Sequence, residues 1–142
     1  VNAGANVVVI GGGSVGAETA DHLALHGSKV TIVEMRSGIA EDASARPRKF
    51  LLERLEAAKA AIYTNAGVLM IGKDAVYIEQ DKQPKKLENV DTVVIATGSK
   101  SYAPLLQELQ NCACEVLAIG DANGVKDGKH NMHEAFATAL QI

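Results

Sequence analysis

The sequence has no tryptophan, only two phenylalanines and three tyrosines in 142 residues, and just two cysteines. So few aromatic side chains leave little for the base-stacking surfaces that bind single-stranded nucleic acids. The net charge of −3 shows no excess of basic residues for a phosphate backbone. No nucleic-acid partner is therefore expected. Two cysteines do not make a disulfide framework, which favours a reducing cytoplasm as the compartment.

Long hydrophobic runs are also missing. Runs such as Val7–Ile10 and Val93–Ala96 are far shorter than the ~20 residues that a membrane span needs. The N-terminus lacks the basic region and apolar core of a secretory signal. These absences predict a cytoplasmic protein without a membrane partner. The hydrophobic fraction of 47% is nevertheless ordinary for a globular domain with a real core.

The first third of the chain has the pattern of a βαβ unit. Asn6–Ile10 and Lys29–Glu34 are apolar and β-branched, which predicts buried parallel strands. Ser14–His26 lies between them with a helical pattern. Strand, helix and strand in about thirty residues form one such unit. The helix is expected to bury a stripe made of Val15, Thr19, Leu23 and Ala24.

After this βαβ unit, the sequence pattern predicts a second helix over Ser44–Ala60 and a third strand at Ala61–Thr64. From Gly67 onward, short strand-like runs separated by polar turns predict an antiparallel β-meander. The segment "DTVVIATG" returns to a buried strand. The fold class expected is α/β: a Rossmann-like parallel sheet flanked by helices, with the meander added. The domain boundary is expected after Gly98, giving domains 1–98 and 99–142.

Beyond Gly98, a short helix or loop is expected over Tyr102–Gln110, a strand over Glu115–Ile119, and a helix over Met132–Gln141. The strand is expected either to join the parallel sheet beside Thr92–Ile95 or to pair with a second copy of the chain, because its apolar residues need cover. A dimer through this C-terminal segment is the second of these alternatives.

The stretch "GGGSVG" after the first strand contains a dinucleotide-binding pattern. Gly11, Gly13 and Gly16 match G-x-G-x-x-G, and the loop also includes Gly12, Ser14 and Val15. In this pattern the first glycine permits a tight turn, the second lets a pyrophosphate approach the backbone, and the third allows close helix packing. A strand-to-helix turn without a ligand is the alternative, but it does not need three glycines at this spacing.

An acidic residue follows at the end of the second strand. Glu34 stands where a carboxylate binds the adenosine ribose hydroxyls and repels a 2′-phosphate, which favours NAD(H) over NADP(H). Arg36 could instead hold a 2′-phosphate, although a solvated surface charge is the preferred interpretation. Glu18 is expected in the first turn of the helix, where its charge suits the helix dipole.

The segments "GGGSVGAE", "TIVE", "VVIATGS" and "LAIGDA", in this order, resemble the pyridine-nucleotide-dependent flavoprotein reductases with two dinucleotide-binding domains. The similarity is greatest to the C-terminal region of Old Yellow Enzyme-type NADH:flavin oxidoreductases, such as 2,4-dienoyl-CoA and 2-enoate reductases. The resemblance implies that Glu18 lies near the nicotinamide–flavin contact. It also implies that Ala96, Thr97 and Gly98 mark the return to an FAD domain, and that Asp121 binds the flavin's ribityl chain.

The resemblance further implies FAD in the full-length protein, and FMN and a 4Fe-4S cluster in a barrel outside this chain. No second glycine fingerprint is present, so the chain is expected to be a fragment: a complete nicotinamide domain with the C-terminal stub of an FAD domain. Its partners would be the FAD and barrel domains of the same longer protein, and the fragment alone would be inactive. No metal site and no catalytic side-chain set are expected. The alternative function is a non-catalytic NAD-binding sensor or scaffold domain.

Overall fold

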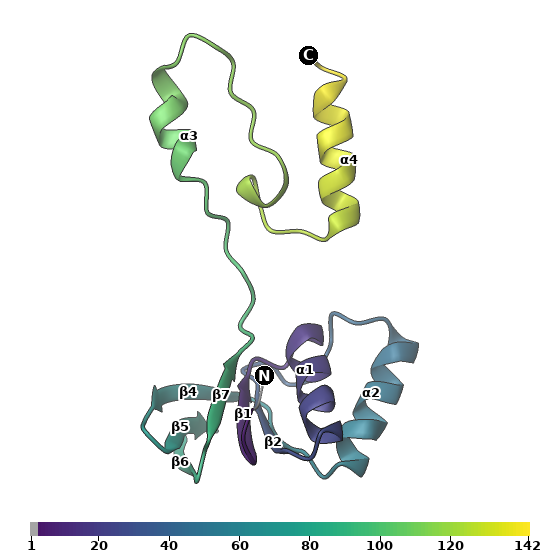
Figure 1. Ribbon diagram of the computed structural model, residues 1–142, viewed down its shortest axis with the longest axis vertical. Helices are drawn as coiled ribbons and strands as arrows, with labels where there is room; N and C mark the ends of the chain where they lie inside the picture. The colour runs from purple at the N-terminus through teal and green to yellow at the C-terminus, as the bar shows by residue number, and fades with distance from the viewer. Residues whose placement is uncertain (1–2) are drawn as a thin grey trace. The chain divides into compact units, whose positions relative to one another are not determined.

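The computed structural model describes residues 3–142, which form two compact units. Unit 1 ends at Gly98 and unit 2 covers Ser99–Ile142. The elements of unit 1, all labelled in Figure 1 except β3, are β1 Asn6–Ile10, α1 Ser14–Leu25, β2 Lys29–Val33, α2 Ala45–Ala57, β3 Ala61–Tyr63, β4 Ala66–Ile71, β5 Ala75–Gln80, β6 Gln83–Glu88 and β7 Thr92–Ile95. Unit 2 contains α3 Pro104–Glu108, the 3₁₀ turns η1 Leu109–Asn111 and η2 Gly120–Ala122, and α4 Gly128–Ala139.

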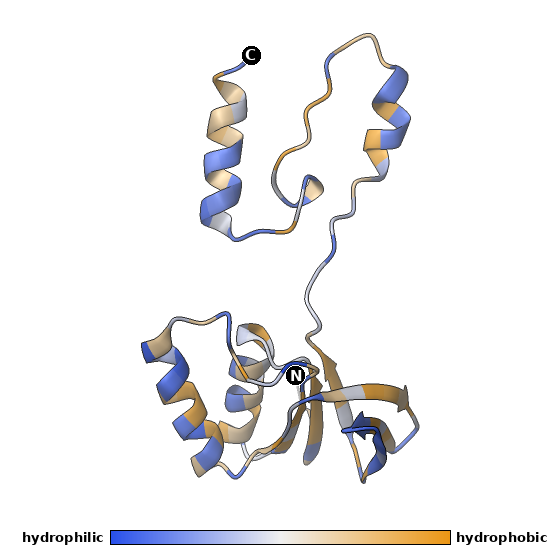
Figure 2. Ribbon diagram, turned by 180° about the vertical axis from the view of Figure 1, so that it is seen from behind, coloured by the Kyte–Doolittle hydropathy of each residue, from blue (hydrophilic) through white to orange (hydrophobic). Residues whose placement is uncertain are grey.

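Unit 1 is built on a parallel sheet with the strand order β3-β2-β1-β7. In its centre Val8 lies opposite Thr31 on β2 and Val93 on β7. Figure 2 shows that hydrophobic residues line these strands. A parallel sheet of this kind is covered on both faces, so its strands are apolar on both sides. The expected α/β, Rossmann-like fold is confirmed.

The two faces of the sheet pack against different layers, as Figure 1 shows for unit 1. Side chains alternate along β1, so Val7 and Val9 belong to the core beneath α1 and α2. Val8 points to the other face, where it joins a second core with Val76 and Ile78 of β5. The β-meander therefore covers the face that the helices leave open.

The expected meander is a three-stranded antiparallel sheet with the order β4-β5-β6. Asp81 and Lys82 join β5 to β6, and both have positive φ values, 51° and 63°. Two consecutive positive φ values match the tight hairpin turns that suit the twist of a β-ribbon. The last strand of the meander, β6, begins earlier than the sequence pattern indicated and includes Pro84. An edge strand such as β6 tolerates proline because its outer side has no neighbouring strand that needs an N–H donor.

The buried face of α1 differs from the expected stripe. The helix buries Gly16, Ala17, Ala20 and Asp21, whereas Val15 is 72% exposed. Small residues face inward because α1 lies close against the glycine loop and the sheet, and a larger side chain would hold it away. Asp21 is acceptable on this face because the guanidinium of Arg54 on α2 donates to its carboxylate, with an Nε–Oδ2 distance of 2.9 Å.

Unit 2 contains no strand in the part of the chain that the structure describes, so the expected strand at Glu115–Ile119 is wrong. A strand needs a neighbouring backbone for its hydrogen bonds, and no described strand pairs with this segment, either beside Thr92–Ile95 or elsewhere. The last helix begins at Gly128, earlier than expected, because the Asp127 side chain accepts a hydrogen bond from the His130 N–H at 2.8 Å. No helix among residues 3–142 is long and apolar enough to cross a membrane.

Candidate nucleotide-binding site

The loop between β1 and α1 is held tightly against the end of β7. Gly11 has a φ of +101°, and a Cβ atom there would overlap with the carbonyl oxygen of Ala96. Its backbone N–H donates to the Val33 carbonyl at 2.9 Å. Positive φ and the close approach each require glycine at this position. The Ala96–Thr97 backbone therefore packs directly against the glycine loop at Gly11.

Gly12 and Gly16 are also explained by packing within the chain. A Cβ atom at Gly16 would overlap with the carbonyl oxygen of Gly11, so this glycine brings α1 close to the loop. A Cβ atom at Gly12 would overlap with the side chain of Ile39 and lie 3.0 Å from the Cβ of Glu34. Gly12 therefore lets the segment after β2 pack directly on the loop, and Gly16 lets α1 do so.

Gly13 has no such explanation in the chain's own packing. A Cβ atom there would come no closer than 3.7 Å to Asp42 and 3.8 Å to Arg36, which is ordinary van der Waals contact. Its φ of −64° and ψ of 178° are open to any residue. The space beside Gly13 is therefore free for a group from outside the chain, at the place where a pyrophosphate approaches the second glycine of the pattern.

Unpaired donors surround this space. Within the described residues, no acceptor is found for the backbone N–H groups of Gly13, Val15 and Gly16. They lie at the N-terminus of α1, where the helix dipole adds a positive potential. Such a helix end is suited to bind a phosphate group.

Glu34 follows β2 directly and is buried, with 6% of its surface exposed. Its Oε2 accepts a hydrogen bond from the Gly12 N–H at 2.5 Å, and its Oε1 accepts one from the Arg36 N–H at 2.7 Å. Burial alone would raise the pKa of Glu34, but these backbone hydrogen bonds and the nearby Arg36 charge hold that pKa below its ordinary value. The side chain is therefore a fixed carboxylate beside the glycine loop.

Arg36 is largely exposed to solvent but also forms an ion pair with Glu34. Its side chain is 59% exposed, yet its Nε lies 3.6 Å from Oε1 of Glu34. The sequence interpretation of Arg36 as a solvated surface charge thus omitted the partner that orients it. A guanidinium held beside Glu34 lowers the net negative charge at the position where a ribose would be recognised.

Asp42 is a part of the site that the sequence did not indicate. The Ser14 N–H, at the start of α1, donates to its two carboxylate oxygens at 2.9 and 3.2 Å. Burial alone would raise the pKa of Asp42, but the hydrogen bond from Ser14 lowers it. The contact joins residues 28 positions apart and depends on the irregular segment between β2 and α2. No motif could have revealed it.

The remaining residues that the sequence suggested for the site make none of the loop contacts described above. Glu18 is exposed and lies beyond the first turn of α1, which contains no acidic residue, so its expected place in that turn is wrong. Val15 is exposed in that first turn. Gly98 has a φ of +88° and ends unit 1. Asp121 belongs to unit 2.

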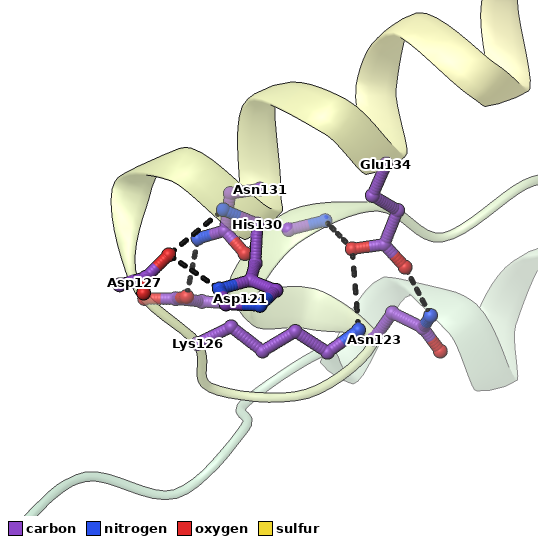
Figure 3. A network of polar contacts seen from close by, with 8 residues as sticks. Asp121, Asn123, Lys126, Asp127, His130, Asn131 and Glu134 are labelled. Carbon is purple, nitrogen blue, oxygen red and sulfur yellow. Dashed lines mark hydrogen bonds and ion pairs between the residues drawn. The ribbon is translucent and has the colours of Figure 1, made fainter.

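In unit 2, Asp121 is part of a polar network that fixes the η2 turn against α4 (Figure 3). Its Oδ1 accepts a hydrogen bond from the Asn131 side chain at 2.8 Å. Glu134 on the same helix accepts hydrogen bonds from the Gly120 N–H at 3.1 Å and from the Asn123 side chain at 2.5 Å. The Gly120–Asp121 turn therefore has a defined geometry although unit 2 buries none of its residues.

Comparison with known protein families matches residues 1–116 to the pyridine nucleotide-disulphide oxidoreductase family model. The chain belongs to the pyridine nucleotide-disulphide oxidoreductases. The match includes all of unit 1, and it is consistent with the glycine loop, Glu34 and the Rossmann-like sheet. The chain is thus a pyridine-nucleotide-binding domain of the flavoprotein oxidoreductase type.

Its relatives include reductases of the Old Yellow Enzyme type, as the motifs indicated. It is 38% identical over 117 residues to bilirubin reductase of Mediterraneibacter gnavus, covering 82% of this chain and 18% of the relative. It is 28% identical over 144 residues to cinnamate reductase of Clostridium sporogenes, covering 99% and 22%. A 2-naphthoyl-CoA reductase structure has a TM-score of 0.82 at 27% identity, with 100% of this chain and 22% of that chain covered. The chain therefore spans about a fifth of the length of these relatives.

Proposed function

We propose that the chain is the nicotinamide-nucleotide-binding module of a larger flavin-dependent oxidoreductase, and that it binds NADH in preference to NADPH. The proposal is supported above all by Gly13, because its missing Cβ leaves a space that the chain itself does not use. A dinucleotide pyrophosphate fits that space in shape and charge. The backbone N–H groups of Gly13, Val15 and Gly16 would receive its oxygens.

The preference for NADH follows from Glu34. Its carboxylate is held beside the loop by Gly12 and Arg36. In that position it would accept hydrogen bonds from the ribose hydroxyls and repel a 2′-phosphate. Arg36 opposes this preference only in part, because its guanidinium already has a carboxylate partner.

In the longer protein, bound NADH would supply a hydride to the flavin, which is the chemistry of the cofactors themselves. The residues of this chain would bind and orient the nucleotide, and we assign no acid–base or nucleophilic role to them. Glu18 on α1 remains a candidate for a place near the nicotinamide. The non-catalytic sensor alternative predicts NADH binding as well, but no reduction of flavin by NADH in the longer protein.

We also propose that unit 2 is part of the FAD domain, with Asp121 as a ligand of the flavin's ribityl chain. Its exposed apolar side chains support this assignment. Met132 and Phe136 on α4 and Leu140 at its C-cap are 75%, 67% and 73% exposed and recur every four residues, so they share one face. An apolar face of this size normally packs against another part of the protein.

The proposal is tested by calorimetric titration of the 142-residue chain with NADH and NADPH, together with the Gly13→Ala variant. A Cβ at position 13 meets only ordinary contacts within the chain, so we expect an unchanged melting temperature. It would project into the proposed pyrophosphate space, so affinity for both nucleotides should fall at least about tenfold, or ~1.4 kcal/mol.

Gly67→Ala is the matched control, because a Cβ there meets no atom within 4 Å and Gly67 lies on β4, outside the loop. This variant should bind NADH like the unchanged chain. Equal NADH affinity in the Gly13→Ala and Gly67→Ala variants would contradict the proposed site, and tighter binding of NADPH would contradict the proposed cofactor preference.

A further inference from the structure

Asp42 places a negative charge at the helix end that the proposed nucleotide would use. Both of its carboxylate oxygens lie within hydrogen-bond distance of the Ser14 N–H. Both would also lie 3.7 Å from a Cβ at Gly13, on the side of the loop where packing leaves space. The carboxylate therefore stands at the border of the proposed pyrophosphate site.

The segment that carries Asp42 is firmly attached to the loop. The Ala40 N–H donates to the Gly12 carbonyl at 2.7 Å, and the Arg48 Nε donates to the Ile39 carbonyl at 2.8 Å. Ile39 and Ala40 are buried, with 4% and 0% of their surface exposed. Asp42 itself is exposed, so its side chain can rotate into solvent while the segment stays in place.

A carboxylate and a phosphate compete for the same features at this position. Each is an anion that gains from a free N–H group and from the positive end of a helix dipole. Two anions within a few ångströms of each other repel, and most strongly where protein atoms exclude water. A pyrophosphate that takes the Ser14 N–H must therefore first displace the Asp42 carboxylate.

We infer that Asp42 is an internal competitor of the nucleotide: its carboxylate caps α1 in the nucleotide-free chain and lowers the affinity for NADH. This inference rests on the proposed function, because it assumes that the pyrophosphate binds at this loop. The apparent affinity of such a chain is reduced by the fraction of molecules in which the competitor occupies the site. Asp42 thus sets the threshold of nucleotide concentration at which the loop fills.

The test compares Asp42→Asn with Glu41→Gln. Each variant removes one negative charge from the same segment, but of the two carboxylates only that of Asp42 accepts a hydrogen bond from the glycine loop. We expect Asp42→Asn to bind NADH about three- to tenfold more tightly, a modest factor because the displaced carboxylate is exposed. Its nucleotide-free melting temperature should be lower, because α1 loses a charged cap. The affinity for adenosine, which has no phosphate, should not change.

Three results would overturn the inference: an NADH affinity of Asp42→Asn that is unchanged or weaker, an equal gain in Glu41→Gln, or an equal gain for adenosine. If the unchanged chain and both variants all fail to bind NADH, the proposed function fails and this inference with it. If the unchanged chain binds NADH and Asp42→Asn gains nothing, only the role of Asp42 is refuted.

Discussion

Gly16 of α1 and the carbonyl oxygen of Gly11 lie so close that a Cβ atom at position 16 would overlap with that oxygen. Alanine is the better helix former by about 1 kcal/mol, which alone would favour a Gly16→Ala variant. The overlap with a backbone atom cannot be relieved by a side-chain rotation, and overpacking of this kind costs about 1–3 kcal/mol or more. We therefore expect Gly16→Ala to lose stability in urea unfolding, whereas Gly13→Ala should not. Equal unfolding midpoints for the two variants would contradict the packing described for the loop.

Replacement of Glu34 by glutamine should narrow the preference for NADH over NADPH. The amide keeps the size of the side chain but no longer repels a 2′-phosphate. A charge-assisted contact of this kind is worth about 1–3 kcal/mol, so the ratio of the two dissociation constants should fall by roughly tenfold. Titration of both nucleotides measures the ratio. An unchanged ratio would mean that Glu34 does not face the ribose.

The same variant should change how stability depends on pH. The pKa of Glu34 is lower in the folded chain than its ordinary value of 4.5, so the folded state favours the carboxylate. Its contribution to stability is therefore fully present above that ordinary value and is lost as the pH falls through the lowered pKa. Urea unfolding of the unchanged chain and of Glu34→Gln should differ most near neutral pH and converge in acid. A difference that grows as the pH falls would contradict the direction of the shift.

Amide hydrogen exchange should separate the two units. Val7–Ile10 lies in the centre of the parallel sheet and should exchange slowly. Val116–Ile119 has no strand partner among the described residues, so its amides should exchange at least about a hundredfold faster, which corresponds to ~3 kcal/mol less protection. Equal protection of the two segments in a chain that light scattering shows to be monomeric would support the expected strand at Glu115–Ile119 after all. Equal protection in a dimer would favour pairing between copies of the chain.

The sequence was most informative where local patterns and tertiary structure agree. The run Asn6–Ile10 is apolar and β-branched because both faces of the sheet are covered there, and its strand was predicted. Thr92–Ile95 also forms its predicted strand, but as an edge strand it is only half-buried and Ile95 is 68% exposed, so the expectation of a buried strand is wrong. The glycine spacing predicted the turn into α1. Periodicity failed for the face of that helix, since Val15 has the hydrophobicity of a core residue but lies where the loop needs small residues instead.

The parts of the site that escaped prediction depend on tertiary structure. Asp42 meets Ser14 only because Ile39 and Ala40 fold over the glycine loop, and nothing in the residue pattern of that segment specifies its path. The segment Glu115–Ile119 shows the opposite case. Its pattern suits a strand, but a strand also requires a neighbour, and the pattern of one segment says nothing about whether a neighbour is available.

The hydrogen bond between the Glu34 carboxylate and the Gly12 N–H limits how this protein can be re-engineered or can diverge. The same side chain that would choose the cofactor also completes the hydrogen bonding of the phosphate loop. An apolar or basic residue introduced at position 34 to accept NADPH, unlike glutamine, would leave the buried Gly12 N–H without its acceptor, at a cost of about 1–3 kcal/mol. A change of coenzyme made through such a residue would thus need a second substitution that restores an acceptor for the Gly12 N–H. Single-site libraries at position 34 should yield poorly folded variants more often than proteins with altered cofactor use.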